Sequence, residues 1–578
     1  MRLFKVSKTY LESIQVIDKF IPRNDNVVGT IYRLNGYIYF LPVNRDDEND
    51  YDTDGHVKHS LPFMIRMTDE TGMKCYGKCL ISNMFAVPYK DLVPLTKNEF
   101  NSAYEKRIEY LKRHKERILN SIKRLYKQKT RGYKQDYLLR TVNFKATEKF
   151  AIRYEIDNYG KHYNRFPDDN FFITNPYTTG ETEYVLMNKN TEIARILYDN
   201  ENNKVIEILE EKETDYAPLD CFKEKKLNAK YMTAWFRGRG IPSWRDGLDD
   251  MLDNLGIENK DMLLNKAFGL SLTDQYWMNP VEMKMEWKEI NFFMNDFNSR
   301  DFIEASFENK VLKKDGVDLY TPNNTSDGML KKAWTVGEDK KRYLLKGSFK
   351  EKDLEPFCEV LASKVGKVLE VDSVDYELEI LNEKVISKCE CFVNEDTELI
   401  SAFSILRHED IDLNTSDYRF LFQKYVDILK KHGIKSAEEK IAKMYILDYL
   451  IVNKDRHLGN FGIIRNCNTL EWIDIAPIFD SGAAMYSQDE IFEYNFSVAY
   501  GTFFNNKHLE FDKILEIVGL NKDLKPDFDS LYSIADEWKR LLYEYQHITD
   551  MLDEKIEALY LGFIERINKL KIIFSNHD

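Results

Sequence analysis

The spacing of hydrophobic and polar residues changes several times along the chain. Residues 27–43 (VVGTIYRLNGYIYFLPV) form two apolar runs separated by Asn35-Gly36, a pattern typical of a β-hairpin. Residues 99–131 change to a helical period, with apolar side chains on one face at Tyr104, Ile108, Leu111, Ile118, Ile122 and Leu125. Residues 1–150 are therefore predicted to form an α+β domain in which strands precede a long helix.

The rest of the chain divides in the same way. Residues 151–180 are rich in turn residues (DNYG, FPDDN, TNPYTTGET) and are predicted to be a linker. Strand patterns resume at 182–212, with a turn at Asp199-Asn200, and helical patterns dominate from 418 onward, broken only by a polar segment at 453–482. We therefore expect a strand-containing region after the linker and a mostly helical region in the last part of the chain.

Composition narrows the class of protein. A chain of 578 residues with 43% hydrophobic residues is long enough for several folded domains. Its formal net charge of −14 argues against a protein whose whole surface binds nucleic acid, and no DNA partner is expected. A local basic patch is compatible with this net charge. The N-terminus lacks the apolar core of a signal peptide, and no apolar run is long enough to span a membrane. We predict a soluble, cytoplasmic protein without a membrane partner.

The seven cysteines fit the same compartment. None forms a C-x-x-C pair, and Cys75 and Cys79 have C-x3-C spacing. Reduced thiols in a cytosolic protein are the favoured interpretation, and a zinc site is the alternative.

A polar segment follows a strongly apolar helical pattern near residue 450. LIVNKDRHLGNFG (450–462) places Asp455 five positions before Asn460. The same spacing separates the catalytic Asp from the metal-binding Asn in the H-R-D-x-x-x-x-N loop of protein kinases, although here Arg and His follow the Asp. Phosphoryl transfer also uses a second metal carboxylate, and WIDIAPIFDSG supplies Asp480, expected at the end of an apolar strand.

Two upstream segments complete the set. KRYLLKGSF places Lys346 in a predicted strand, and EPFCEVLASKVGKVL places Glu355 and Glu359 at the start of a predicted helix. In kinases, a strand Lys paired with a helix Glu orients the ATP phosphates. TPNNTSDGMLKKAW predicts a turn that leads into a strand, as expected of a loop that covers phosphates. Each residue taken alone also fits a turn, a cap or a solvated strand position, but the order of the set favours phosphoryl transfer.

This set resembles the HipA-like kinase family, and the likeness extends beyond the motif. FRGRGIPSWR (236–245), GLSLTDQYW (269–277), SDGMLKKAW and LEPFCE are similar to segments ahead of the catalytic core in one branch of that family. The resemblance covers roughly residues 180–578. It implies a two-lobed serine/threonine kinase, with the N-terminal region and N-lobe at 181–395 and a mostly helical C-lobe at 396–578. Such a kinase transfers the ATP γ-phosphate to a protein hydroxyl and to itself.

The resemblance also implies roles for individual residues. Asp455 is expected to be the catalytic Asp, Asn460 and Asp480 to hold Mg²⁺, and Lys346 to contact the ATP phosphates with Glu359 as its partner. ATP and Mg²⁺ are therefore the expected cofactors.

The loop over the phosphates is the second implied feature. Thr325, Ser326 and Gly328 are expected to bind ATP, and Thr325 or Ser326 is expected at the family's autophosphorylation position. The loop is less glycine-rich than in the family, so the hydroxyl that is phosphorylated stays open.

The predicted helix at 105–131 is basic in an otherwise acidic protein. It holds eleven Lys and Arg against three Glu. Such a helix is either a solvated face or a phosphate-binding surface for RNA. The candidate RNA contacts on it are Lys112, Arg113, Lys123 and Arg124.

The N-terminal region resembles the ToxN/AbiQ family of endoribonuclease toxins. GTIYRLNGYIYFLPV, LISNMFAVP and YEKRIEYLKRHKERILNSIKRLYKQK occur in the family's order within roughly residues 1–150. The resemblance implies a type III toxin that a repeat RNA holds in check. Where the family has a Ser-Pro-Lys-like cleavage segment, this chain has Asn44-Arg45-Asp46-Asp47, and Val28 replaces an aromatic residue. Further RNA-site candidates are Arg45, Lys58 and His59; the last two either replace the missing base and acid or are surface residues.

Two hypotheses for the whole chain stay open. In the first, a HipA-like kinase is fused to a ToxN/AbiQ-like domain that binds or cleaves RNA, within a bacterial toxin–antitoxin or phage-defence system. In the second, the endoribonuclease is the effector, and the kinase half is regulatory or only binds nucleotide. The expected partners are a protein substrate of unknown identity, an antitoxin or target RNA, and a protein antitoxin.

Overall fold

The structure is a computed structural model that divides the chain into two compact units. Unit 1 comprises Met1–Tyr177, Asn279–Ile290 and Lys313–Tyr320, and unit 2 comprises Thr178–Met278, Asn291–Leu312 and Thr321–Asp578. The structure describes residues 3–24, 27–34, 37–95, 102–159, 165–166, 169–172, 175, 177, 180–242, 248, 252, 261–283, 285–297, 299–307, 320–325, 330–349, 353–504 and 507–576.

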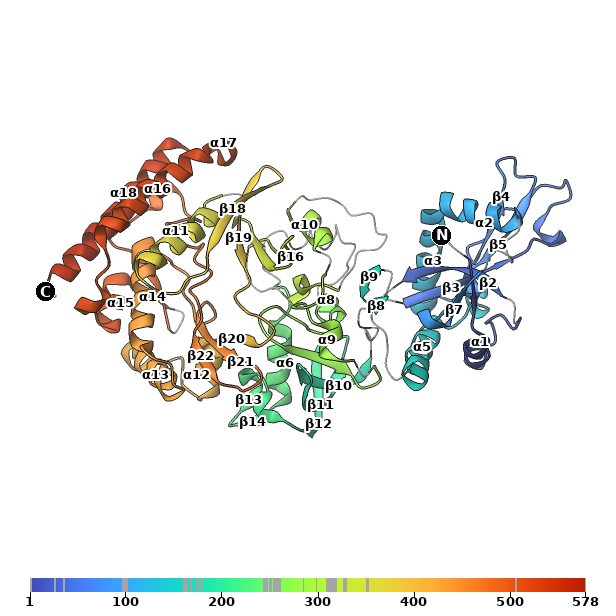
Figure 1. The fold of residues 1–578 in the computed structure, drawn as a ribbon, viewed down its shortest axis with the longest axis horizontal. Helices are drawn as coiled ribbons and strands as arrows, with labels where there is room; N and C mark the ends of the chain where they lie inside the picture. Colours follow the sequence, from blue (N-terminus) through green and yellow to red (C-terminus); the bar gives the residue numbers. More distant parts are fainter. Residues whose placement is uncertain are drawn as a thin grey trace. The chain divides into compact units, whose positions relative to one another are not determined.

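Unit 1 is built on a mixed set of strands and helices (Figure 1). Its elements are β1 (Phe4–Val6), α1 (Lys8–Ile14), β2 (Val28–Leu34), β3 (Tyr37–Asn44), β4 (Met64–Thr68), β5 (Cys75–Leu80), β6 (Phe85–Ala86), β7 (Leu92–Pro94), α2 (Ser102–Arg113), α3 (Lys115–Thr130), α4 (Asp136–Leu139), α5 (Phe144–Tyr159), β8 (Arg165–Phe166), β9 (Asp169–Phe172) and α9 (Trp287–Ile290). The main sheet has the order β4-β5-β3-β2-β1-β7, and β6 also pairs with β3.

The structure confirms the predicted hairpin and corrects the predicted basic helix. β2 and β3 pair antiparallel in a register that places Leu34 opposite Tyr37, as a two-residue connection requires. The basic segment forms two helices, α2 and α3, because the backbone of His114 departs from helical geometry at φ −111° and ψ 21°. Residues 151–159, assigned above to the linker, instead complete α5. The three proposed domain boundaries stay predictions.

Unit 2 holds the remaining elements (Figure 1). They are β10 (Glu181–Asn188), β11 (Thr191–Asp199), β12 (Lys204–Glu211), β13 (Phe222–Lys223), β14 (Lys226–Leu227), α6 (Ala229–Gly238), α8 (Asp261–Lys266), β15 (Tyr276–Pro280), α10 (Arg300–Phe307), β16 (Lys332–Val336), β17 (Arg342–Lys346), α11 (Glu355–Val368), β18 (Tyr376–Leu381), β19 (Lys384–Glu390), β20 (Thr397–Ser401), α12 (Ala402–His408), α13 (Tyr418–Lys431), α14 (Ala437–Ile451), β21 (Gly462–Asn466), β22 (Trp472–Ile475), β23 (Tyr500–Phe503), β24 (Lys507–Glu510), α15 (Phe511–Val518), α16 (Phe528–Glu544), α17 (Gln546–Thr549) and α18 (Asp553–Ser575).

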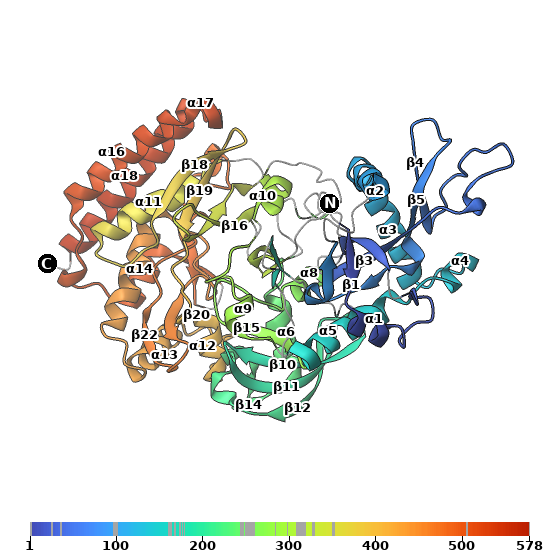
Figure 2. The ribbon, with the colours of Figure 1, turned by 45° about the vertical axis from the view of Figure 1, so that its right-hand side comes forward.

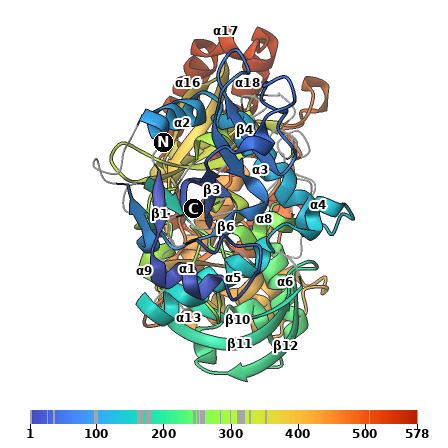
Figure 3. The same ribbon diagram turned by 90° about the vertical axis from the view of Figure 1, so that its right-hand side faces the viewer.

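Two four-stranded sheets form the first half of unit 2. One has the order β12-β11-β10-β15, and its first three strands lie side by side in Figure 3. The other has the order β16-β17-β19-β18, and α11 packs along β18 and β19 (Figure 2). Side chains alternate between the faces of a strand, so neighbouring residues of β17 point to opposite sides of this sheet.

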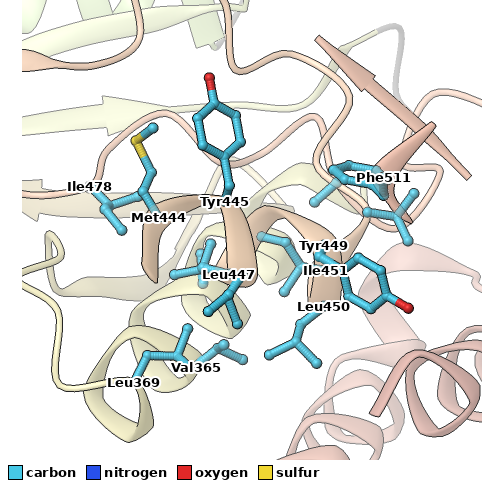
Figure 4. Close-up of a cluster of buried hydrophobic side chains, with 14 of the residues drawn as sticks. Val365, Leu369, Met444, Tyr445, Leu447, Tyr449, Leu450, Ile451, Ile478 and Phe511 are labelled. Atoms are coloured by element: carbon cyan, nitrogen blue, oxygen red, sulfur yellow. The ribbon is translucent and has the colours of Figure 1, made fainter. Parts of the chain in front are cut away.

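The second half of unit 2 is mostly helical. The second half of α14, residues 444–451, is buried on all sides and apolar except for Asp448, which is the pattern of a core helix. Its Tyr445, Leu447 and Leu450 belong to the same cluster as Val365 of α11 and Leu369, the residue after that helix (Figure 4). Near the end of the chain, α16 and α18 pack against each other (Figure 1).

Both units therefore have a mixed α+β architecture, and the predicted fold class is confirmed. The non-helical interruption is longer than predicted, because the β23–β24 hairpin extends it to Glu510. All seven cysteines are free thiols. In the described ranges, no helix has the length and apolarity that a membrane span requires.

Candidate active site

Lys346 is the centre of a buried ion network in unit 2. It is the last residue of β17 and is 3% exposed. Its Nζ lies 2.7 Å from Glu359 Oε1, 2.7 Å from Asp480 Oδ1 and 3.2 Å from the hydroxyl of Tyr376. An ammonium has three N–H donors, so these three acceptors use all of them.

Glu359 lies on α11, one turn after the helix begins. Pro356 occupies the first turn, where its missing N–H costs no helical hydrogen bond. The second carboxylate oxygen of Glu359 accepts a hydrogen bond from the backbone N–H of Ser481 at 2.9 Å. Burial alone would lower the pKa of Lys346, but Asp480 and Glu359 outweigh it and raise that pKa, so Lys346 is a cation.

Asp480 lies in a loop, which corrects the prediction that it ends a strand. β22 ends at Ile475, and Asp480 has a left-handed backbone with φ 56°. Burial alone would raise the pKa of Asp480, but the charges of Lys346 and Lys332 outweigh it and lower that pKa. Asp480 is therefore a carboxylate that remains ionised well below neutral pH.

Asp455 and Asn460 lie in the loop after α14. The Asn460 side-chain N–H donates to the Asp455 carbonyl at 2.9 Å, which leaves the amide oxygen of Asn460 for another partner. The Asp455 side chain is exposed, and no group in the described part of the chain donates a hydrogen bond to its carboxylate. Desolvation by the surrounding protein and the negative charge of Asp480 raise the pKa of Asp455, whereas His457 opposes this rise.

The structure thus brings the predicted kinase residues into one site. Lys346, Glu359 and Asp480 are in direct contact. Arg456, the residue after Asp455, donates to the carbonyls of Asn460 and of Phe479, which precedes Asp480. Carboxylate and amide oxygens are the ligands that Mg²⁺ prefers. Asn460 and Asp480 therefore fit a magnesium ion by their chemistry, and Lys346 fits an anionic phosphate.

The loop predicted to cover the phosphates differs from expectation. Thr325 is 7% exposed, and its hydroxyl donates to the Leu270 carbonyl at 2.6 Å. This hydrogen bond and the burial make Thr325 inaccessible as a phosphate acceptor or an ATP contact in this conformation. Ser326 and Gly328 lie outside the described residues.

Sequence patterns missed three residues of the site. Tyr376, on β18, is the third partner of Lys346. Arg456 is fully buried and pairs with Asp448 of α14, with its Nε 2.9 Å from Asp448 Oδ2. A charged residue inside the apolar run of α14 was the available signal, because buried charges are almost always paired.

The candidate RNA residues of unit 1 do not form a comparable network. Arg45, Lys58 and His59 are exposed; Lys58 Nζ donates to the Asn49 carbonyl at 3.0 Å, and the His59 carbonyl accepts from Arg66. No general acid–base pair results from these contacts.

The basic helices present a partly exposed cationic surface. Lys112, Arg113 and Arg124 are exposed, whereas Lys123 is half-buried. Arg113 pairs with Glu70 and Glu109, and Arg107 is buried, with its Nε donating to the Tyr76 carbonyl at 2.6 Å. The eleven cations of this segment therefore do not all face solvent.

The acidic loop after β3 is held to the sheet of unit 1 by ion pairs with β4 and β5. Asp50, 1% exposed, accepts from Arg66 Nε and from Lys78 Nζ, both at 2.8 Å. Lys78 Nζ also lies 2.7 Å from Asp47. The two carboxylates at this position are thus neutralised by β4 and β5 and not by the basic helices.

A buried strand Lys paired with a helix Glu, together with an Asp-x4-Asn loop, is typical of protein kinases. Comparison with known proteins finds a likeness to a protein kinase and, for residues of unit 1, a likeness to a family of toxins. Residues 2–151 match the family model described as toxin ToxN, type III toxin–antitoxin system. The chain is similar to the serine/threonine-protein kinase CtkA of Helicobacter pylori, with 29% identity over 143 residues that cover 23% of this chain and 41% of the relative.

A second curated relative and a solved structure complete the comparison. The endoribonuclease ToxN of Bacillus thuringiensis subsp. kurstaki is 24% identical over 138 residues, which cover 22% of this chain and 66% of the relative. A structure of the Shewanella oneidensis HipA, HipB and operator DNA complex matches at 12% identity and a TM-score of 0.42, covering 67% of this chain and 97% of that one. Less than two thirds of either curated relative is therefore matched. The family-model match and the two curated relatives confirm the predicted resemblance to kinases and to ToxN toxins.

Proposed function

We propose that unit 2 is a serine/threonine protein kinase, that unit 1 binds RNA, and that the chain acts in a bacterial toxin–antitoxin or phage-defence system. One observation carries the kinase assignment. The Lys346 ammonium lies 2.7 Å from both Glu359 and Asp480, in the unit whose Asp455 and Asn460 have the kinase spacing.

Asp455 is the residue that meets the substrate hydroxyl. Its carboxylate is exposed and free of hydrogen bonds from the described residues, so it is accessible to an entering Ser or Thr side chain. An ionised carboxylate orients the hydroxyl and accepts its proton as the oxygen attacks phosphorus.

The remaining residues position the nucleotide. When bound, Mg²⁺ neutralises charge on the transferring phosphoryl group. Asn460 and Asp480 supply oxygens for it, and Lys346 binds phosphate oxygens while Glu359 keeps its ammonium in place. Lys346 exchanges its contact with Asp480 for a phosphate, because its three donors are otherwise occupied.

Autophosphorylation is part of the proposal, with Ser326 as the acceptor in place of Thr325. Thr325 is hydrogen-bonded to a buried carbonyl, whereas Ser326 is the next hydroxyl along the chain. A phosphate in this loop adds about −1.5 to −2 charge and repels a nucleotide nearby.

For unit 1 we propose RNA binding, with an antitoxin repeat RNA as the partner. The match of residues 2–151 to the ToxN family model and the exposed cations of α2 and α3 support this proposal. Endoribonuclease activity is the second candidate; the same match favours it, whereas the acidic Asp46-Asp47 in the cleavage segment argues against it.

One experiment separates these activities. The purified chain is incubated with γ-labelled ATP and Mg²⁺, and in parallel with labelled RNA. We expect label in protein and a phosphorylated Ser326 by mass spectrometry. The exposed Asp523→Ala variant serves as the control for Asp455→Ala, because Asp523 lies on a surface turn after α15. RNA cleavage without phosphoryl transfer would overturn the kinase assignment and favour the alternative.

A further inference from the structure

Arg456 uses every hydrogen-bond donor that a guanidinium has. Its Nε and Nη2 bind the two oxygens of Asp448 at 2.9 and 3.0 Å, and Nη2 also donates to the Ser481 hydroxyl at 2.8 Å. Its Nη1 donates to the Asn460 carbonyl at 2.9 Å and to the Phe479 carbonyl at 2.7 Å. These five bonds account for all five N–H groups of a fully buried side chain.

The partners of Arg456 come from three segments of the site. Asp448 belongs to the rigid core helix α14, Asn460 is one candidate metal ligand, and Phe479 and Ser481 flank the other, Asp480. A single planar group therefore fixes the backbone on both sides of Asp480 relative to the backbone of Asn460.

The backbone near Arg456 is strained, which explains why the hydrogen bonds of Arg456 are needed to hold it. Val452 has φ 51° and ψ 50°, and Asp480 has φ 56°, both in the left-handed region. For a β-branched residue this conformation is rare, and strained positions of this kind persist only when the surrounding structure over-determines them. Asp448 supplies part of that constraint, since its Oδ1 accepts from Asn453 Nδ2 at 2.8 Å, directly after Val452.

We propose that Arg456 is a positioning residue that sets the separation between Asn460 and Asp480, and that it thereby tunes the affinity of the site for Mg²⁺. The inference rests on the kinase function proposed above. It adds a role for Arg456, which the spacing of Asp455 and Asn460 does not predict. Arg456 itself contacts neither substrate nor metal. Residues that orient metal ligands typically change metal affinity or activity about 10–100-fold when they are replaced.

The test uses Arg456→Lys, which keeps the positive charge and loses the planar fork. Mg²⁺-dependent binding of a fluorescent ATP analogue is titrated, together with turnover and the thermal unfolding midpoint. The matched control is Arg465→Lys: Arg465 is a second buried arginine in unit 2, 2.8 Å from the buried Glu398. We expect Arg456→Lys to raise the half-saturating Mg²⁺ concentration about tenfold or more, whereas Arg465→Lys lowers the unfolding midpoint and leaves Mg²⁺ dependence unchanged.

Four outcomes would overturn the inference. Equal Mg²⁺ shifts in both variants, or lower turnover of Arg456→Lys at an unchanged half-saturating Mg²⁺, would show that Arg456 acts only through stability. If Arg456→Lys does not fold, Ser481→Ala removes one of the five bonds, and an unaltered Mg²⁺ dependence of this variant overturns the inference as well. Wild-type protein that binds no nucleotide with Mg²⁺ would instead overturn the proposed function and, with it, the inference.

Discussion

The two units each contain a buried ion network. The networks differ in whether the carboxylate at the edge of the network is hydrogen-bonded within the protein. In unit 1, Asp50, Arg66, Lys78 and Asp47 neutralise one another, and the two partners of Asp50 are half-buried or buried. In unit 2, Lys346 neutralises Glu359 and Asp480, and the negative charge of Asp480 also raises the pKa of the exposed Asp455. Asp47, at the edge of the first network, is exposed, but each of its carboxylate oxygens accepts a hydrogen bond, one from Lys78 and one from the Asn49 N–H, so we call this network closed. The Asp455 carboxylate accepts no hydrogen bond from the described residues, so the second network leaves oxygens available to a ligand.

This difference explains which predicted site the structure supports. A closed network satisfies its buried charges and holds a loop in place, without reactivity toward outside groups. An open network keeps an ionisable group accessible and shifts its pKa, as functional sites commonly do. Asp47, which the resemblance to ToxN-like toxins predicts to lie in the cleavage segment, belongs to the closed network.

The largest effect is expected at the open end of the network in unit 2. Asp455→Ala should reduce phosphoryl transfer from ATP at least about 10²-fold, because the base that accepts the hydroxyl proton is absent from this variant. The thermal midpoint should not fall, since Asp455 makes no side-chain hydrogen bond with described residues. Equal labelling of wild type and Asp455→Ala would remove Asp455 from the reaction.

The closed network is expected to affect stability and not chemistry. Asp50→Ala leaves Arg66 buried without its carboxylate, and breaking a buried pair typically costs about 3–5 kcal/mol. Hydrogen exchange of β3, β4 and β5 amides measures the destabilisation of unit 1 separately from unit 2. Asp54→Ala, at an exposed position of the same loop, should change stability by less than about 0.5 kcal/mol. If both variants behave alike, the network does not hold the loop.

Glu355 offers a third case, a buried acid whose Oε2 has no hydrogen-bond partner among the described residues. Burial raises the pKa of Glu355 from 4.5 to about 7. The folded protein therefore keeps this proton to a higher pH than the unfolded chain does, so the stability that Glu355 contributes falls as pH rises from 4.5 through 7. As pH rises from 4.5 to 8, the free energy of unfolding of Glu355→Gln should increase relative to that of wild type by up to about 3 kcal/mol.

Urea unfolding at the two pH values measures this gain. Glu377→Gln is the matched control, because Glu377 is exposed on β18 and undergoes the same change of charge. A pH-independent difference between Glu355→Gln and wild type would contradict the raised pKa.

The smallest effect is expected on the basic surface of unit 1. The variant replaces Lys112, Arg113, Lys123 and Arg124 by Glu. We measure how the logarithm of the association constant for single-stranded RNA falls with the logarithm of the salt concentration. The slope of this line should become shallower by about 0.7 for each phosphate group that the variant no longer binds. The control reverses four exposed lysines of unit 2: Lys204, Lys223, Lys226 and Lys230. An equal change in slope for the unit 1 variant and the unit 2 control would show that net charge alone governs binding. If RNA binding by wild type does not depend on salt, α2 and α3 are an ordinary solvated face.

The sequence by itself determined the features that depend on neighbouring residues. The Asn35-Gly36 pair between apolar runs specified the β2–β3 hairpin, and the continuous apolar run specified the buried helix α14. The Asp455–Asn460 spacing likewise produced a loop in which the Asn460 amide bonds the Asp455 carbonyl. Hydrogen bonds and side-chain periodicity within a few residues settle such elements, so local pattern is enough.

Only the tertiary structure decided how distant segments meet. Lys346 and Asp480 are 134 positions apart, yet they share an ion pair, and Arg456 becomes fully buried because Asp448, Asn460 and the backbone beside Asp480 surround it. The left-handed loop at Asp480, where a strand end was predicted, has the same origin, since packing against other elements stabilises a conformation that its own residues disfavour. Burial and charge pairing are properties of the assembled core, and a linear pattern of residues does not contain them.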